Sequence, residues 1–509
     1  MPNYQNLCRP CYTGRVREEG WEVCKNFYVE RYESTGGKYE YALIGTPGSW
    51  PTAWDGSSYG NGKFRGMYTA SDGKTMFVVI GNALLKCPDS ENDPLIFIYT
   101  LPDIETPVEM VDDGRFLGIV DGNDLYVYNL STVSTVTTPV TGLVHPSHIT
   151  FLDGRTYVNN TFIDPTVSYP KTDSLIYFSN IGDMSKWFLH VEGVPDDPTA
   201  LTFIVAQGSS DTGLKTIKRV SDKIWALGNR TYKIYATSSD PNTPLTRVGN
   251  SLQDIGLYAE RSAAVLRDSL FFLGTTIRGG LSVYCSTGYD VVRISTHAIE
   301  YLLGQNDSTD AIGWTYEIEG HSFYVITLQK AELTFVWDVS EGAWHEAGSR
   351  EFGTDRNTIW EPIFASSRGK ETYVGSYISS KVLRLDIDKY DEWDGRPIKR
   401  EISGMVVWDD MKMVRHNRLT LDLHCGNGRV QDNEQGYIPQ VMMSYSDDGG
   451  WTWSDEELAT SGKLGNYNQR VYWNRLGMAY SRVYRFIMTD PVKWIIIGAS
   501  LLDDVAGRQ

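Results

Sequence analysis

Cysteine and histidine residues that could bind a metal or carry redox chemistry are few in this sequence. Cys8 and Cys11 have C-x-x-C spacing, but a closed zinc site needs four ligands, and Cys24 alone supplies no second close pair. No helical pattern follows directly to lower a thiol pKa, as a redox motif requires. His145 and His148 lie close together without a third candidate ligand. We therefore expect no metal and no cofactor.

Nucleophile and acid–base patterns are equally sparse. Residues 56–60 read G-x-S-x-G, but a nucleophile elbow needs a strand before it and a helix after it, and this copy lies in a turn-rich stretch. The carboxylate pairs Asp386/Asp388 and Asp409/Asp410 fit solvated strand ends better than an acid–base pair. No phosphate-binding glycine loop, dinucleotide fingerprint or zinc-protease motif is present. We expect no catalytic residues and no enzymatic activity.

One motif is well formed. Residues 446–453 fit S-x-D-x-G-x-T-W, the Asp-box of sialidase propellers, through Ser446, Asp448, Gly450, Thr452 and Trp453. The aspartate is expected to accept N–H groups of a hairpin turn, the glycine to take a positive φ, and the tryptophan to pack beneath. In sialidases this hairpin recurs and lies away from the catalytic centre, so we predict a structural role. A glycan-binding or sialidase-like glycoside hydrolase is the alternative.

The strands that would position such residues belong to a pattern that repeats along the chain. A polar turn precedes one or two short apolar runs, and it recurs mostly at roughly 40–50 residues, the period of a β-propeller blade. The seven turns lie at Asp72, Asp113, Asp153, Asp222, Asp268, Glu319 and Arg368. The spacing allows six or seven blades, and two unrelated β-sandwiches with evenly spaced hairpins remain the alternative.

The chain divides into three parts by pattern. Residues 1–63 are a polar lead-in expected to wrap or close the body, and residues 64–400 form the propeller-like body with an insertion near 180–214. Residues 401–509 show clean alternation between turn clusters and predict an antiparallel β-sandwich. Only 261–267 and 297–303 have modest helical patterns. The fold class is therefore all-β.

Composition excludes several classes. The 509 residues carry a net charge of -17, with 41% hydrophobic, 22% charged and 12% aromatic residues. These are the values of a folded protein rich in strands. The acidic charge argues against gripping DNA or an anionic membrane surface. No apolar run reaches the roughly 20 residues of a membrane span, and no secretory signal is readable. We expect assembly in a cytoplasm without membrane anchoring.

Three stretches resemble one family, the tail hub or packaged-DNA stabilisation proteins of short-tailed bacteriophages. Near the start, a Cys-x-Asn-aromatic-Tyr segment precedes a Thr-Pro-Gly turn, and in the middle a strand that contains Thr231 and Tyr235 leads to an Ile-Gly turn. The closing segment, with Arg-Val-Tyr-Trp-Asn followed by Arg-Val-Tyr-Arg-Phe and Asp-Pro-Val, is the most specific. These stretches are residues 24–28 with 41–48, 224–238 with 250–274, and 470–477 with 482–486, 490–492 and 497–499. Met478 and Tyr480 depart from the family, which commonly has basic or polar residues there.

The resemblance implies a structural role in the virion tail. Such proteins are expected to form a homo-hexameric ring below the portal and its adaptor, to close the DNA exit channel after packaging, and to carry the tail needle, fibres or spikes. DNA would pass through the channel without specific binding. A ring of copies must use heterologous interfaces that close on themselves.

Overall fold

Each repeated turn links two neighbouring antiparallel strands of one sheet. The computed structural model describes residues 3–5, 23–34, 38–59, 62–102, 106–131, 136–137, 145–159, 174–187, 201–206, 213–240, 243–249, 254–276, 278–351, 353–354, 356–404, 406–409 and 412–505. Within these residues, seven such sheets follow one another along the chain. The seven sheets are the blades of a β-propeller, so seven is the blade number.

Blades 1–4 each contain four strands. Blade 1 contains β6 (Phe64–Thr69), β7 (Met76–Ile80), β8 (Ala83–Cys87) and β9 (Ile96–Thr100), and blade 2 contains β10 (Glu109–Asp112), β11 (Phe116–Val120), β12 (Leu125–Asn129) and β13 (Val136–Thr137). Blade 3 contains β14 (Ile149–Leu152), β15 (Arg155–Asn159), β16 (Leu175–Phe178) and β17 (Phe203–Val205), and blade 4 contains β18 (Leu214–Val220), β19 (Lys223–Gly228), β20 (Tyr232–Thr237) and β21 (Leu245–Arg247). The insertion expected near 180–214 falls in blade 3, and 188–200 and 207–212 lie outside the described residues.

Blades 5–7 follow in the same order. Blade 5 contains β22 (Ile255–Leu257), β23 (Ala264–Leu266), β24 (Ser269–Thr276), β25 (Leu281–Thr287) and β26 (Asp290–Arg293), and blade 6 contains β27 (Ile312–Ile318), β28 (His321–Leu328), β29 (Leu333–Asp338) and β30 (Ala343–Ala347). Blade 7 contains β33 (Pro362–Arg368), β34 (Glu371–Ser376), β35 (Lys381–Asp386) and, from the start of the chain, β5 (Gly48–Asp55). Short elements between blades are η1 (Ser57–Tyr59), β31 (Ser349–Arg350) and β32 (Asn357–Thr358), and η3 (Glu260–Ser262) lies within blade 5 between β22 and β23.

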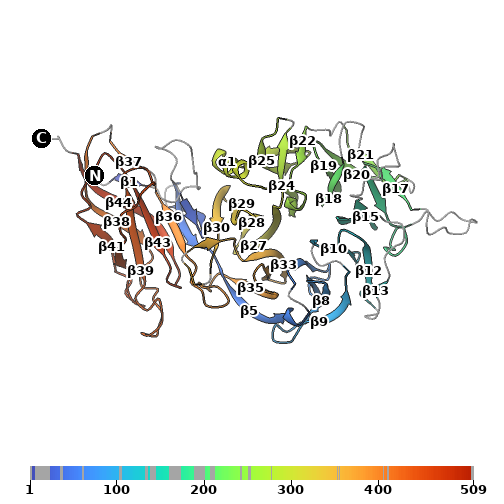
Figure 1. The fold of residues 1–509 in the computed structure, drawn as a ribbon, viewed down its shortest axis with the longest axis horizontal. Helices are drawn as coiled ribbons and strands as arrows, with labels where there is room; N and C mark the ends of the chain where they lie inside the picture. The colour runs from blue at the N-terminus through green and yellow to red at the C-terminus, as the bar shows by residue number, and fades with distance from the viewer. Residues whose placement is uncertain are drawn as a thin grey trace, which may run out of the picture.

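The innermost strands meet around a common axis (Figure 1). Each contacts the next, in the order β6, β10, β14, β18, β23, β27 and β33, and β33 contacts β6 again. The ring is closed by β5, which precedes blade 1 in sequence and pairs with β35, the third strand of blade 7. Closure by an N-terminal strand ties the two ends of the propeller together.

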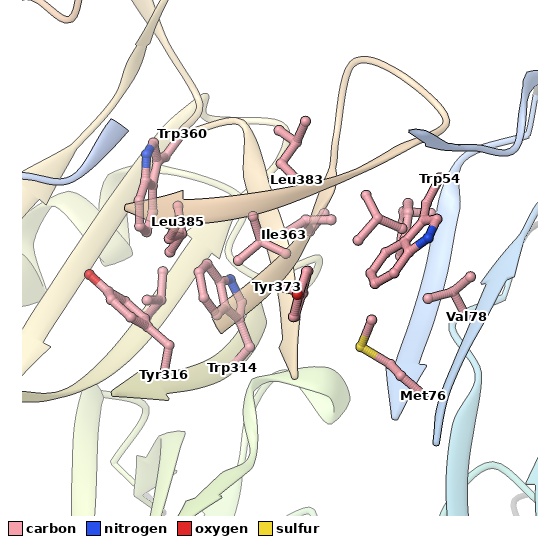
Figure 2. Packing of buried hydrophobic residues seen from close by; sticks show 14 of the residues in the cluster. Trp54, Met76, Val78, Trp314, Tyr316, Trp360, Ile363, Tyr373, Leu383 and Leu385 are labelled. Atoms are coloured by element: carbon pink, nitrogen blue, oxygen red, sulfur yellow. The ribbon is translucent and has the colours of Figure 1, made fainter. Parts of the chain in front are cut away.

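Apolar side chains pack between the blades. Strand β7 shows why its residues form a continuous apolar run: Met76, Val78 and Ile80 pack toward blade 7, and Phe77 and Val79 pack toward blade 2. A strand buried on both faces has no solvent side, so it does not alternate. Figure 2 shows one such layer, in which Trp54 of β5 lies beside Met76 and Val78.

The two helical patterns have different outcomes. Residues 297–303 lie in α1 (His297–Gln305), which begins at an N-cap where the Thr296 hydroxyl accepts the Ile299 N–H. The expectation of a helix over 261–267 is wrong, because β23 occupies Ala264–Leu266. That segment is an innermost propeller strand whose pairing with β24 outweighs its local pattern.

The sandwich follows the propeller and packs two sheets around one core. One sheet has the order β3 (Phe27–Ser34), β4 (Lys38–Gly45), β44 (Ile495–Val505), β38 (Val414–Leu423) and β41 (Val471–Asn474), with β1 (Asn3–Gln5) on β44 and β42 (Met478–Ala479) on β38. The other has the order β2 (Val23–Lys25), β36 (Arg400–Ser403), β43 (Ser481–Met488), β39 (Gln440–Ser446) and β40 (Glu457–Thr460), with β37 (Val407–Trp408) on β43. Residues of the N-terminal lead-in thus supply strands to both sheets of the sandwich.

Propeller and sandwich share a continuous sheet. Strand β30, the outer strand of blade 6, pairs in parallel with β2, and β2 pairs antiparallel with β36 of the sandwich. The Lys25 ammonium also lies 3.0 Å from the Glu346 carboxylate of β30. In Figure 1, β30 and β36 lie between the ring of blades and the sandwich. Because backbone hydrogen bonds cross the boundary, the two modules are not joined by a flexible linker alone.

Candidate functional site

Asn26 holds the joint between the propeller and the sandwich. It follows β2 with a φ of 57°, a conformation that asparagine tolerates better than most residues. Its side-chain amide donates to the carbonyls of Gly348 (2.9 Å) and Lys399 (2.8 Å), and its side-chain oxygen accepts the Gly348 N–H (2.9 Å). The side chain is 1% exposed, so these bonds are made without competing water. One residue therefore joins β2, the end of blade 6 and the approach to β36.

Two glycines allow the chain to pass this joint closely. A Cβ at Gly48 would lie 2.3 Å from the Asp391 carbonyl oxygen, and one at Gly45 would lie 2.4 Å from the Arg400 Nε. Between them the Thr46 N–H donates to the Asn26 carbonyl. The Thr46 carbonyl accepts Arg400 Nη2 at 3.0 Å. The Asn-containing segment and the Thr-Pro-Gly turn of the sequence resemblance therefore meet in space.

Charged groups are buried beside this joint. Glu361 and Glu392 are 0% and 3% exposed. Arg396 Nη2 lies 2.6 Å from the Glu361 carboxylate, which also accepts the Trp393 indole N–H. Burial, reinforced by the neighbouring Glu361 carboxylate, raises the pKa of Glu392 to about 7. Burial also lowers the pKa of Arg400 to about 10. Such buried charges hold their elements together, because moving one member of an ion pair away leaves the other charge buried and unpaired.

The Asp-box residues form a hairpin turn between β39 and β40. Asp448 accepts the Trp451 and Thr452 N–H groups at 3.0 Å and the Ser446 and Thr452 hydroxyls at 2.7 and 2.6 Å. These hydroxyl and backbone hydrogen bonds hold the pKa of Asp448 well below its usual range. Gly450 has a φ of 93°.

The base of the hairpin is tied to β43. The Arg482 guanidinium forms a bidentate ion pair with Asp447 at 2.5 and 2.8 Å, and it lies over the Tyr445 ring. The Arg485 guanidinium lies 4.1 Å from the Trp453 ring centroid. Arg482 and Arg485 belong to the closing segment of the sequence resemblance, so that segment supports the hairpin. The hairpin lies in the sandwich and not in a propeller blade.

A polar cluster crosses four blades near the propeller axis. His148 is fully buried, with Nδ1 2.7 Å from Glu109 of β10 and Nε2 3.1 Å from Glu260 of η3. The Lys218 ammonium of β18 lies 2.6 Å from Glu109, and the Arg261 guanidinium lies 3.5 Å from it. Burial alone would raise the pKa values of both carboxyls, but His148, Lys218 and Arg261 together hold the pKa of Glu109 well below its usual range. The hydrogen bond with His148 and the nearby Arg261 charge lower the pKa of Glu260 to about 2.

The cluster was not found from the sequence. His148 looks isolated there, because its partners come from residues in other blades. Nothing local marks Glu109, Lys218 or Glu260 as neighbours, and only the closed propeller brings them together.

The remaining candidates do not form a reactive site. Cys8 and Cys11 lie outside the described residues, as do Gly60 and Asp410. The Gly56 stretch follows β5 and contains η1, and Asp386 accepts the Trp50 indole N–H at the end of β35. Within the described residues, no group of three His, Cys, Asp or Glu side chains is placed to hold a metal ion. No helix there is long and apolar enough to span a membrane.

Both modules match a single family. Residues 55–390 match the family described as bacteriophage P22 Gp10, β-propeller, and residues 399–501 match bacteriophage P22 Gp10, β-sandwich. The chain belongs to the bacteriophage P22 Gp10 family. The resemblance read from the sequence is thereby confirmed, as is the all-β fold of a propeller followed by a sandwich. The family consists of tail hub and stabilisation proteins of short-tailed phages, so this Gp10-type chain is a phage tail structural protein and a virion component.

Solved structures with a similar fold share little sequence with this chain. No curated protein matches its sequence. Its fold is similar to the Neurospora crassa Pan2 WD40 domain at 9% identity and a TM-score of 0.39, covering 64% of this chain and 89% of that one. It is similar to the N-terminal domain of Nup159 at 9% identity and a TM-score of 0.39, covering 71% and 98%. It is also similar to the extracellular domain of BT4673 from B. thetaiotaomicron at 9% identity and a TM-score of 0.42, covering 76% and 46%.

Proposed function

We propose that this protein is the ring-forming hub of the tail. In this proposal copies assemble as a homo-hexamer below the portal–adaptor complex, close the DNA exit channel after packaging, and anchor the needle, fibres or spikes. Assembly takes place in the host cytoplasm. The observation that carries the proposal is the match of both modules, residues 55–390 and 399–501, to one phage structural family.

The joint between propeller and sandwich supports a role in resisting internal pressure. A protein that retains packaged DNA must resist internal pressure without its modules moving apart. Here a sheet runs from blade 6 into the sandwich through β2, and the buried Asn26 side chain bonds both sides of the boundary. Propeller closure by β5 adds a second long-range tie. Packed and hydrogen-bonded boundaries of this kind favour one rigid body.

Charge supports passage of DNA without binding. The net charge of -17 repels phosphates, and an acidic chain has no overall excess of cations to drive counterion release from DNA. A hub that gripped DNA would oppose ejection. We therefore assign DNA no specific site on this chain.

No observation favours the glycan-active alternative. Its motif was the Asp-box, and the Asp448 turn lies in the sandwich, where its side chain is occupied by turn hydrogen bonds. We propose that the protein is not an enzyme, in keeping with the structural phage families that it matches.

DNA retention by particles tests the function. Phage particles are assembled in cells that lack this chain and in cells that supply it, and DNA that a nuclease can reach is measured. We expect filled heads to lose their DNA without the chain and to retain it when the chain is supplied. Equal DNA retention in both preparations would overturn the proposed role in closing the channel.

A further inference from the structure

The Asp-box hairpin displays an aromatic side chain at its tip. Trp451 is 80% exposed, the highest value among the large hydrophobic residues that the structure describes. The turn beneath it is fixed by the hydrogen bonds of Asp448, and its base is fixed by the Arg482–Asp447 ion pair. A rigid turn loses little conformational entropy when it binds, and tryptophan is enriched among residues that dominate interface energies.

A groove lies on the propeller, between blade 5 and helix α1. It has a volume of about 910 Å³ and is lined by Tyr258, Thr276, Gly279, Gly280, Leu281, Ser282, Tyr284, Arg293, His297, Glu300, Tyr301 and Gly304. This volume falls within the roughly 300–1,000 Å³ of clefts that bury a drug-sized group. A Cβ placed at Gly280 or Gly304 would meet no atom within 4 Å, so both glycines border open space.

The two surfaces carry complementary charge. The hairpin continues into three exposed acidic residues, Asp455, Glu456 and Glu457. The groove carries Arg293 and His297, both exposed, with Glu300 between them at 3.2 and 3.5 Å. The exposed Arg278 lies between the lining residues Thr276 and Gly279. Two cationic side chains at pH 7, with one carboxylate among them, favour an acidic partner.

We propose that the Trp451 hairpin of one copy docks in the blade-5 groove of the neighbouring copy. This inference rests on the proposed ring. A closed ring of more than two copies needs two unlike surfaces on each chain, and the hairpin and groove are an unlike pair on different modules. Trp451 would contact the tyrosine-lined wall, and the acidic residues after it would face Arg278 and Arg293.

Cross-linking in particles tests the contact. Two differently tagged variants, Asp455→Cys and Gly280→Cys, are made in a Cys285→Ser background and supplied together to infected cells. Purified particles are then treated with a short bis-maleimide. We expect a covalent dimer carrying both tags, and none when Trp408→Cys, an exposed sandwich position, replaces Asp455→Cys. Particles that contain both variants without a mixed-tag dimer would overturn the contact and leave the hub function standing. Absence of both variants and of the unmodified chain from particles would instead overturn the hub function.

A groove-filling variant supplies an independent readout. Gly304→Gln adds a side chain into open space, and glutamine forms helix more readily than glycine, so α1 should be retained. We expect Gly304→Gln and Trp451→Ala to reduce incorporation into particles at least tenfold, with unchanged circular dichroism, whereas Trp408→Ala incorporates normally. Normal incorporation of Gly304→Gln would overturn the contact.

Discussion

Replacing Asn26 by aspartate should weaken the joint between the propeller and the sandwich, so that the two modules unfold separately. Asn26→Asp keeps the size of the side chain and its acceptor for the Gly348 N–H, but it removes the amide donors to the Gly348 and Lys399 carbonyls. A buried group left without its hydrogen bond costs about 1–3 kcal/mol. The bond to the Gly348 carbonyl is buried and that to the Lys399 carbonyl is partly buried, so we expect a loss of about 1–4 kcal/mol in the free energy of unfolding. A carboxylate facing two carbonyl oxygens adds to this loss.

Asn427→Asp is the matched control. The Asn427 amide also donates to two carbonyls, those of His424 and Lys493, both at 3.2 Å. This bridge is exposed, so water can replace the lost donors, and the expected cost is about 1 kcal/mol or less.

Calorimetry and urea unfolding measure the effect. We expect Asn26→Asp to lower the temperature and the urea midpoint of the first unfolding transition, and to make the sandwich and the propeller unfold in separate transitions. Asn427→Asp should unfold with the same profile as the wild type. If the two variants lose the same stability, within about 0.5 kcal/mol, Asn26 does not hold the joint.

Three further predictions concern charge and the hairpin. Because its folded pKa is raised to about 7, Glu392 contributes stability that is present below pH 4.5 and lost as pH rises through 7. Glu392→Gln should remove about 3 kcal/mol of this dependence, measured by unfolding between pH 4 and pH 9. Glu260, with its pKa lowered to about 2, stabilises the fold above pH 4.5 and loses this effect as pH falls toward 2, so Glu260→Gln should lower the melting temperature at pH 7 more than at pH 3. Asp448→Ala should lower the melting temperature by releasing turn donors.

Each of these has a clear contrary result. Parallel pH profiles for Glu392→Gln and the wild type would exclude a proton held at that carboxyl. An equal loss of melting temperature at pH 7 and pH 3 would contradict the ion-pair role of Glu260. An unchanged melting temperature for Asp448→Ala would mean that its turn hydrogen bonds add nothing to stability.

Local patterns allowed much of the propeller to be predicted. A polar turn such as Asp153-Gly154 places a positive φ where two strands reverse, and the short apolar runs after it must be buried. All seven such turns in the repeat connect the innermost strand of a blade to the next strand, which in blade 5 means β23 to β24. The blade number could not be settled from spacing, since the intervals vary and the long segments between the strands of blade 3 break the period.

Long-range pairing could not be predicted. Strand β2 is three residues long and pairs with residues 401–403 far along the chain, so no local periodicity reveals it. For the same reason β3 and β4 were not recognised as sandwich strands. The Asp-box turn is detectable because its bonds are local, whereas the His148 cluster depends on closure of the whole ring.

The stoichiometry of purified particles tests the hub proposal most directly. Quantitative mass spectrometry would compare this chain with the portal, which is expected to be present in twelve copies by family analogy. The proposal predicts one copy of this chain for every two portal chains, as a six-fold hub requires. Absence of the chain from particles, or a ratio that varies between preparations, would contradict the hub.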